Sequence, residues 1–173
     1  MESPSEISIR SFRPDDAPKL LQLFRDTIRR VNSRDYTPEQ IDAWASDEID
    51  LQAWSDRFEG RFVAVAESDG RLVGFGELEA DGHIDRFFVS ADHQRIGVGR
   101  SLLDAIVSEA GRLDIARLST EASITARPFF EDQGFETLAS QIVVSRGIEF
   151  RNYRMSRSLS SRPPADSSPH TVA

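Results

Sequence analysis

A glycine-rich turn in the middle of the chain limits its fold most, because the turn joins an apolar strand directly to an amphipathic helix. Residues 87–103 read Phe-Phe-Val-Ser-Ala-Asp-His-Gln-Arg-Ile-Gly-Val-Gly-Arg-Ser-Leu-Leu, with Gln94, Gly97 and Gly99 at the spacing Gln-x-x-Gly-x-Gly. Glycine permits backbone angles that other residues resist and leaves no side chain between the amides and a ligand. The first N–H groups of a helix are unpaired and lie at the positive end of its dipole. The stretch therefore predicts a pyrophosphate site.

Other glycine-rich loops fit this turn less well. A Walker A loop ends in Gly-Lys-Ser or Gly-Lys-Thr, and no such triplet follows here. A dinucleotide-binding Rossmann turn needs a third glycine and an earlier strand–helix–strand unit, which this sequence lacks. A turn that only connects a strand to a helix fits the short motif equally well, so the rest of the chain must decide.

Length, charge and cysteine content limit the function classes. We expect the 173 residues to form one domain over residues 1–159, followed by a disordered tail over 160–173 that is rich in serine and proline. A net charge of −8 disfavours nucleic acid as a partner, because phosphate binding needs a basic face. The absence of cysteine excludes disulfides, thiolate metal sites and a cysteine nucleophile, and we expect no metal. Without a long apolar run or a signal pattern, we expect a cytoplasmic enzyme that has no membrane association.

Hydrophobic periodicity and turn signals divide the domain into an α+β arrangement. Alternating apolar residues bounded by Asp-Gly turns predict strands, whereas an apolar face at helical spacing predicts helices. The sequence Thr-Pro-Glu-Gln at Thr37 is a capping box that starts a helix. The expected strands are 7–12, 61–67, 72–78, 83–89, 115–121, 135–145 and 149–159, and the expected helices are 14–31, 38–44, 50–58, 98–113 and 125–133. A right-handed crossover through helix 98–113 predicts parallel pairing of strands 83–89 and 115–121.

The glycine-rich stretch resembles motif A of the GCN5-related N-acetyltransferases (the GNAT superfamily), whose Arg/Gln-x-x-Gly-x-Gly/Ala loop holds the pyrophosphate of acetyl-coenzyme A. The order β-α-α-β-β-β-α-β-α-β-β is also the order of that superfamily, so the resemblance covers about residues 6–158. Two long segments, residues 31–44 and residues 122–135, are similar to the YafP-type branch. The resemblance implies the GNAT fold, a mixed central sheet of about seven strands flanked by helices.

The same resemblance implies an N-acetyltransferase that transfers the acetyl group of acetyl-CoA to a primary amine of a small molecule and releases coenzyme A. Because no cysteine can hold the acetyl group, direct transfer in a ternary complex is expected. One alternative is acylation of a protein or an aminoacyl-tRNA, since the final hairpin is locally basic. Another is a catalytically weak acetyl-CoA sensor or interaction module, because Phe130 stands where many members have a tyrosine that protonates the leaving thiolate.

The resemblance also implies which residues hold the cofactor. A backbone amide at the end of strand 83–89, that of Phe88 or Val89, is expected to hold the thioester carbonyl. The pyrophosphate is expected on the amides of the turn, with arginine charges and a serine hydroxyl added, although the arginines also fit the role of ordinary solvated side chains. The expected cofactor-binding residues in and beyond the turn are Gln94, Arg95, Ile96, Gly97, Val98, Gly99, Arg100, Ser101 and Ser123.

The acceptor amine must lose a proton before it attacks, since the pKa of a lysine-like amine is roughly 10.4. His83 and Asp85 are the predicted catalytic residues. They lie two apart on one strand and so face the same side, where they can act as a pair, singly or through a water. Family members with a side-chain base commonly carry it at one or both of these places. The simpler interpretation of His83 is an exposed residue at the start of a strand.

Three further residues are predicted to contact the acceptor. Tyr36 and Trp44 are expected to line its pocket, because the first two helices cover that side of the cleft in the GNAT fold. Trp44 fits a core position on an amphipathic helix equally well. Glu77 is expected to bind a cationic substrate, or to be an ordinary polar strand residue. The sequence leaves a monomer and a homodimer open, the latter with C2 symmetry.

Overall fold

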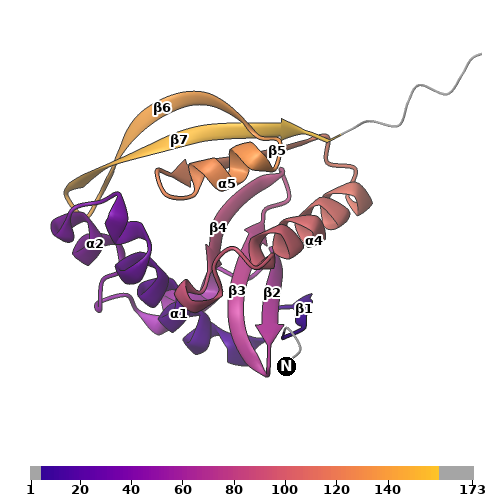
Figure 1. Cartoon of the computed structure of the whole chain (residues 1–173), viewed down its shortest axis with the longest axis horizontal. Coiled ribbons are helices and arrows are strands. Elements are labelled where there is room, and N and C mark those ends of the chain that lie inside the picture. Colours follow the sequence, from indigo (N-terminus) through magenta and orange to yellow (C-terminus); the bar gives the residue numbers. More distant parts are fainter. Residues whose placement is uncertain (1–4, 160–173) are drawn as a thin grey trace, which may run out of the picture.

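The chain folds around one seven-stranded mixed sheet with helices on both faces, in a computed structural model that describes residues 5–159 (Figure 1). Seven strands follow one another along the chain: β1 (Ile7–Ser11), β2 (Phe62–Ser68), β3 (Arg71–Leu78), β4 (His83–Val89), β5 (Arg117–Ser123), β6 (Glu136–Ser145) and β7 (Ile148–Ser158). The α-helices are α1 (Ala17–Arg30), α2 (Pro38–Trp44), α3 (Leu51–Asp56), α4 (Val98–Arg112) and α5 (Arg127–Asp132). Three short 3-10 helices precede α1, α2 and α4: η1 (Pro14–Asp16), η2 (Asn32–Arg34) and η3 (Ala91–His93).

The expected α+β class and the mixed sheet of about seven strands are confirmed. Each predicted helix and strand is present, and the bounds of β4 are those expected. The capping box at Thr37 is formed in both directions, since its hydroxyl accepts from the amide of Gln40 at 3.2 Å while the Gln40 side chain accepts from the Thr37 amide at 2.8 Å. The tail expected over 160–173 lies outside the described residues.

The sheet has the strand order β1-β2-β3-β4-β5-β7-β6. The predicted parallel pair is present between β4 and β5, and the other neighbouring strands are antiparallel. This parallel pair is short, because only His83↔Ser119 and Ile84↔Thr120 are in register. Beyond these pairs β4 stays on β3 and β5 stays on β7, so the sheet opens between the C-terminal halves of β4 and β5.

A β-bulge in β4 changes which side chains reach each face. Gly76 pairs with Phe87 and Leu78 pairs with Ile84, so Glu77 on β3 lies opposite both Asp85 and Arg86. A bulge of this kind places one extra residue in the strand and re-aims its side chains. Both charged side chains of β4 therefore meet Glu77 and its neighbours, on one face of the sheet.

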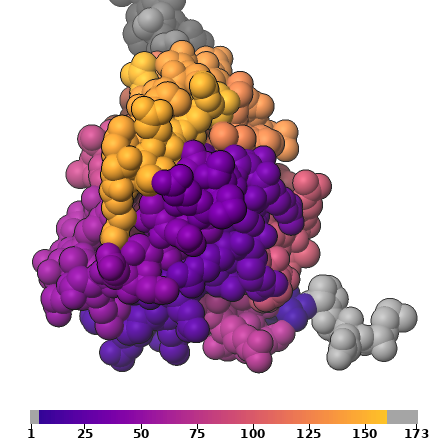
Figure 2. Space-filling view, turned by 90° about the vertical axis from the view of Figure 1, so that its left-hand side faces the viewer, coloured from indigo at the N-terminus to yellow at the C-terminus, as the bar shows by residue number. Residues whose placement is uncertain are grey.

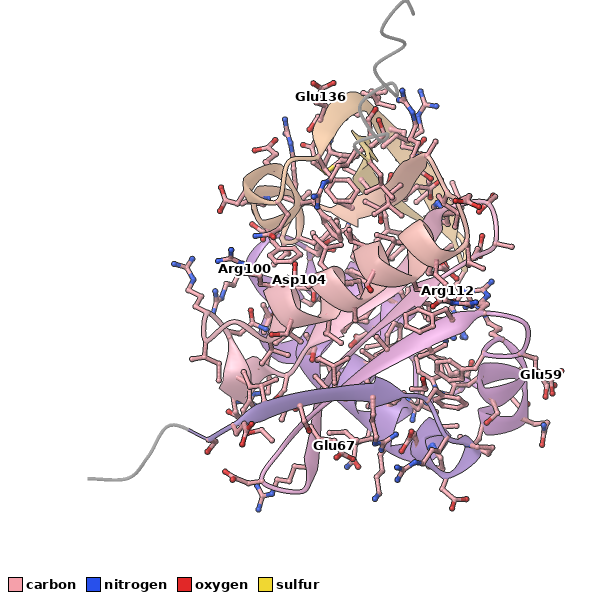
Figure 3. All side chains as sticks on the ribbon, turned by 90° about the vertical axis from the view of Figure 1, so that its right-hand side faces the viewer. Glu59, Glu67, Arg100, Asp104, Arg112 and Glu136 are labelled. Atoms are coloured by element: carbon pink, nitrogen blue, oxygen red, sulfur yellow. The ribbon has the colours of Figure 1, made fainter. Side chains whose placement is uncertain are left out.

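The core lies in two layers, one on each face of the sheet. Helices α1, α2 and α3 cover one face through a cluster that includes Phe24, Trp54 and Phe75. Helix α4 crosses the other face, with α5 beside it, over a cluster that includes Leu103 and Phe130. Figure 3 shows α4 lying across the sheet, from Arg100 near its first turn to Arg112 at its last. No helix within residues 5–159 has the length and apolarity needed to cross a membrane.

Candidate active site

The opening between β4 and β5 is a cleft of about 1060 Å³. Its walls come from β4, β5, the start of α4, α5 and the helices of the N-terminal region, and the β6–β7 hairpin covers one end. In Figure 2 that hairpin, coloured orange and yellow, lies directly against the indigo and purple N-terminal helices. The cleft collects most of the predicted site residues: Tyr36, Trp44, His83, Asp85, Phe88, Val89, Gln94, Arg95, Gly97, Val98, Gly99, Arg100 and Ser123. Glu77, Ile96 and Ser101 do not line it.

The glycine-rich turn starts α4 with its amides free. Gly97 has φ +94°, in the left-handed region that favours glycine, and Arg95 has φ +59° two residues earlier. Left-handed residues in such a turn direct successive N–H groups toward one concave side, which binds anions. The first helical hydrogen bond of α4 is Ser101 N–H to Gly97 O at 3.0 Å, so the amides of Val98, Gly99 and Arg100 precede the helical ladder. The 15 residues of α4 add a helix dipole behind these donors.

Gly99 lies against an aromatic ring. A Cβ at this position would lie 3.1 and 3.2 Å from two ring atoms of Phe129, whose ring stacks on Phe87 with centroids 5.4 Å apart. The glycine therefore lets α5 pack closely against the first turn of α4, beside the cleft.

Three of the residues expected to bind the cofactor differ from the others in their contacts. The Gln94 side chain donates to the carbonyls of Val89 at 2.7 Å and Ser90 at 3.2 Å, so it closes the loop onto the end of β4. Ile96 is exposed and Ser101 already uses its amide within α4, and neither lines the cleft. The structure gives Gln94 a bracing contact, and the expected cofactor contacts of these three residues stay predictions.

Hydrogen-bond alternation distinguishes the two candidate amides at the end of β4. Ser90 donates its N–H to Val73 on β3 at 2.8 Å, and the Phe88 carbonyl lies 3.1 Å from where a Cβ of Gly74 on β3 would stand. Alternate residues of a strand direct their N–H and C=O to opposite sides. Val89 therefore faces away from β3, and its carbonyl indeed accepts from Gln94 and from Thr27 at 3.3 Å. The Val89 amide faces the open side of the sheet, where the cleft lies.

The structure brings His83 and Asp85 into the same cleft but gives them different partners. His83 Nδ1 lies 3.2 Å from Ser119 Oγ on β5, and Nε2 has no partner within residues 5–159. Asp85 Oδ2 accepts from Arg61 at 2.5 Å and from Arg57 at 2.8 Å. Burial raises the pKa of Asp85, but the hydrogen bond from Arg61 and the charges of Arg57, Arg61 and Arg86 outweigh it, so that the pKa lies below its ordinary value. Asp85 is therefore a carboxylate held in an ion-pair cluster.

The ion pairs of Asp85 with Arg57 and Arg61 predict how the thermal stability of the protein changes at low pH. Because the pKa of Asp85 is lower in the folded protein, its stabilising effect is complete above the unfolded value of roughly 3.9 and is lost as the pH falls through the folded pKa. We expect Asp85→Asn to lower the thermal midpoint at pH 7 and to flatten its decline below about pH 4. Thermal unfolding from pH 3 to 7 measures this, and an unchanged acid decline in the variant would contradict it.

Glu77 is unavailable to a substrate. Its side chain is 0% exposed, and it accepts hydrogen bonds from Nε and Nη2 of Arg86, the latter at 2.9 Å, and from Arg61 at 3.2 Å. Burial raises the pKa of Glu77, and the hydrogen bond and charge of Arg86 offset part of that rise. The expected contact with a cationic acceptor is therefore corrected: Glu77 is a structural counter-ion beneath the cleft.

Tyr36 and Trp44 line the cleft, as expected, and also fix its wall. The Tyr36 hydroxyl donates to the carbonyl of Arg151 on β7 at 2.8 Å and accepts from the amide of Ile124 after β5 at 2.9 Å. Trp44 packs edge-on against Tyr36, Phe88 and Phe150. Trp44 thus both lines the cleft and packs against the core, and its contact with an acceptor stays a prediction.

At the α5 side of the cleft, Phe130 is 2% exposed and packs against Phe87, Phe129 and Phe135. It is a core aromatic that lines the cleft without a hydroxyl. The nearby hydroxyl of Ser123 accepts from the amide of Ala126 at 3.0 Å, so it caps the turn that leads into α5.

Sequence reasoning missed the arginines. Arg57 follows α3, Arg61 precedes β2 and Arg86 lies within β4, so they meet only in the folded chain. Arg86 alone gave a signal, as a charge next to Asp85 in a strand that otherwise holds mostly apolar residues.

Comparison with known proteins agrees with this geometry. Residues 32–157 match the family described as "Acetyltransferase (GNAT) domain". The chain is 35% identical over 151 residues to the uncharacterized N-acetyltransferase YafP of Escherichia coli (strain K12). The alignment covers 87% of this chain and 95% of YafP. The crystal structure of a GCN5-related N-acetyltransferase from Rhodopseudomonas palustris superimposes with a TM-score of 0.86 at 30% identity, over 92% of this chain and 100% of that one.

A more distant structure has the same fold. The PaiA N-acetyltransferase of Thermoplasma acidophilum, solved in complex with coenzyme A, matches with a TM-score of 0.72 at 16% identity, over 89% of this chain and 99% of that one. The resemblance implied by the glycine-rich turn and by residues 31–44 and 122–135 is confirmed, and the chain belongs to the GNAT family of acetyltransferases.

Proposed function

We propose that this acetyltransferase moves the acetyl group of acetyl-CoA directly to the primary amine of a small molecule bound in the cleft, and that it works in the cytoplasm. Acetyl-CoA is the cosubstrate, and the coenzyme A in PaiA supports placing it here. The observation that carries the proposal is the meeting of three features in one cleft: the free amides of α4, the open edge of β4 and the His83–Asp85 pair.

The geometry supports a direct mechanism. The amides of Val98, Gly99 and Arg100 would hold the pyrophosphate, so the pantetheine arm follows β4 toward Val89. The Val89 N–H would donate to the thioester oxygen as negative charge develops there, a contribution of roughly 3–4 kcal/mol for one such donor. The amine nitrogen bonds to the acetyl carbon, the C–S bond breaks, and sulfur leaves as the thiolate of coenzyme A.

In this proposal the proton of the amine reaches His83 through water in the cleft, because His83 and Val89 stand at opposite ends of β4, roughly 20 Å apart along an extended strand. The His83 Nε2 is free within the described residues, whereas two arginines hold Asp85 as a weakly basic carboxylate. Asp85 then supplies negative charge beside the ammonium and the imidazolium.

Two structural features support a small acceptor. The β6–β7 hairpin is fastened over the cleft, because Gln40 donates to the carbonyl of Glu149 at 2.8 Å and Arg146 donates to Ser46 Oγ at 3.1 Å. That cover leaves little room for a folded protein or a tRNA, and the net charge of −8 opposes the latter. A sensor that binds acetyl-CoA without turnover is the remaining alternative, since Phe130 offers no acid to the thiolate.

Chemical rescue tests the proposed base. We expect His83→Ala to lower kcat by roughly 100-fold or more while acetyl-CoA affinity is unchanged, because the side chain faces the acceptor side and not the phosphate turn. Added imidazole should restore part of kcat, as measured by release of free thiol with an amine panel.

The matched control is Ser119→Ala, because it removes the hydroxyl that contacts His83 Nδ1 but keeps the imidazole itself. An active His83→Ala beside an inactive but folded Asp85→Asn would transfer the role to Asp85. Tight acetyl-CoA binding without thiol release from any amine would support the sensor.

A further inference from the structure

Arg86 is a buried arginine with one end of its guanidinium unused. Its side chain is 6% exposed, and its Cζ lies 4.0 Å from the ring centroid of Trp54 and 4.6 Å from that of Phe58. Nε and Nη2 donate to the two carboxylate oxygens of Glu77. Nη1 is buried and has no partner within the described part of the chain. A buried donor without an acceptor costs free energy, so native proteins rarely leave one unpaired.

Arg86 lines the cleft, and Glu77 occupies only one edge of its guanidinium. Glu77 approaches from β3 and occupies the Nε–Nη2 edge of the planar group, so Nη1 is at the opposite end. The other neighbour of β4 is β5, and beyond Ile84 the sheet is open on that side. Arg86 lines the cleft together with Trp54 and Arg57. Nη1 is shielded in the structure, so a movement of the side chains that cover it would let an oxygen of a bound molecule complete the hydrogen bonding of Arg86.

The part of the cleft that lies outside the glycine-rich turn and α5, here called the acceptor half, carries charges that favour a bound anion. Outside the glycine-rich turn and α5, five arginines and three carboxylates line the cleft: Arg34, Arg57, Arg86, Arg146, Arg151, and Asp50, Asp85, Glu121. This excess of positive charge occurs in a chain whose net charge is −8. Arg57 contributes one contact to Asp85 at 2.8 Å and is half-exposed, so most of its donors remain for a ligand at the rim.

We propose that the acceptor is an amino carboxylate, whose carboxylate accepts hydrogen bonds from Arg86 Nη1 and from Arg57 while its amine points along β4 toward Val89. This inference rests on the proposed function, because it names the acceptor of the same site. An arginine that is already paired with Glu77 and packed against two aromatic rings is suited to bind a planar carboxylate. The bulge in β4 makes the arrangement possible, since it directs Asp85 and Arg86 to the same face.

Matched acceptors test the proposal. The purified enzyme and acetyl-CoA are assayed for thiol release with α-, β-, γ- and ε-amino carboxylates, each beside its carboxamide and beside the amine that lacks the group. We expect kcat/KM to be at least about tenfold higher for a carboxylate than for its carboxamide, as for a hydrogen bond to a charged group. The α-amine of a carboxamide has a pKa of roughly 7.7–8.0, so a larger share of it is in the neutral, reactive form near pH 7 than for the matching carboxylate. Amine ionisation therefore favours the carboxamide and cannot cause a preference for the carboxylate.

The variant Arg86→Lys removes Nη1 and keeps the positive charge near Glu77. Its KM for the carboxylate should rise about tenfold or more, with little change for the carboxamide. Retained acetyl-CoA binding and a measured thermal midpoint show that the variant is folded. Arg10→Lys is the matched control, because Arg10 forms a similar two-nitrogen contact with Asp16 outside the cleft and should leave both KM values unchanged.

A second readout does not depend on turnover. Saturation-transfer NMR with coenzyme A present compares binding of the same carboxylates and carboxamides. Selective carboxylate binding that Arg86→Lys abolishes supports the inference, even if no amine is acetylated and the proposed function fails. Equal use or equal binding of carboxylates and carboxamides overturns the inference, while turnover of the carboxamides still supports the proposed function.

Discussion

Replacement of Gly97 by glutamate is expected to weaken acetyl-CoA binding by roughly 100-fold or more, because a carboxylate would stand among the amides proposed to hold the pyrophosphate. The substitution has room, since a Cβ at Gly97 meets no atom within 4 Å. It also forces a non-glycine residue into φ +94°, at a cost of about 1–3 kcal/mol in backbone strain. Calorimetric titration of acetyl-CoA into the folded variant measures the effect.

Two controls separate charge from strain. Gly97→Ala has the same backbone strain without the carboxylate, and we expect it to keep most of the affinity. Gly111→Glu places the same charge near the other end of α4, also in open space, and should bind acetyl-CoA as the wild type does. If Gly97→Glu binds within threefold of Gly97→Ala, the pyrophosphate does not lie on this turn.

The conformation of the turn was predictable because it depends on local sequence. Gly97 provides the left-handed angle, and the strand and helix on either side have periodicities that need no long-range information. The capping box at Thr37 was predictable for the same reason, since its two hydrogen bonds join residues three apart. The parallel pair of β4 and β5 followed from the handedness of the crossover.

The acceptor half was not predictable, because its contacts join distant segments. Arg57 and Arg61 reach Asp85 across 28 and 24 residues of sequence, and the bulge that turns Arg86 to the same face leaves no mark in the hydrophobic pattern. Alternation alone placed His83 and Asp85 on one side of β4 but gave no sign that Asp85 is ion-paired. Glu77 was misjudged for the same reason: an acidic strand residue reads as exposed until its buried counter-ion is known.

Removal of Glu77 is expected to give the largest loss of stability. Glu77→Leu would leave Arg86 buried, 6% exposed, without its counter-ion. Breaking a buried ion pair from one side typically costs about 3–5 kcal/mol, because the remaining charge stays desolvated. For a domain of this size, each kcal/mol lowers the thermal midpoint by roughly 2–4 °C. Calorimetric or circular-dichroism melting of the two proteins measures the difference.

The double variant Glu77→Leu, Arg86→Met tests the cause. Because a buried pair replaced by apolar residues of similar size is often neutral, the double variant should be more stable than Glu77→Leu alone. Additive losses from the two single variants would show that the pair itself has no such coupling.

A double variant whose stability is restored also tests which acceptor the enzyme prefers. It would retain the glycine-rich turn, His83 and Arg57 but lack the Arg86 guanidinium, so its preference for carboxylates over carboxamides should fall to what Arg57 alone provides.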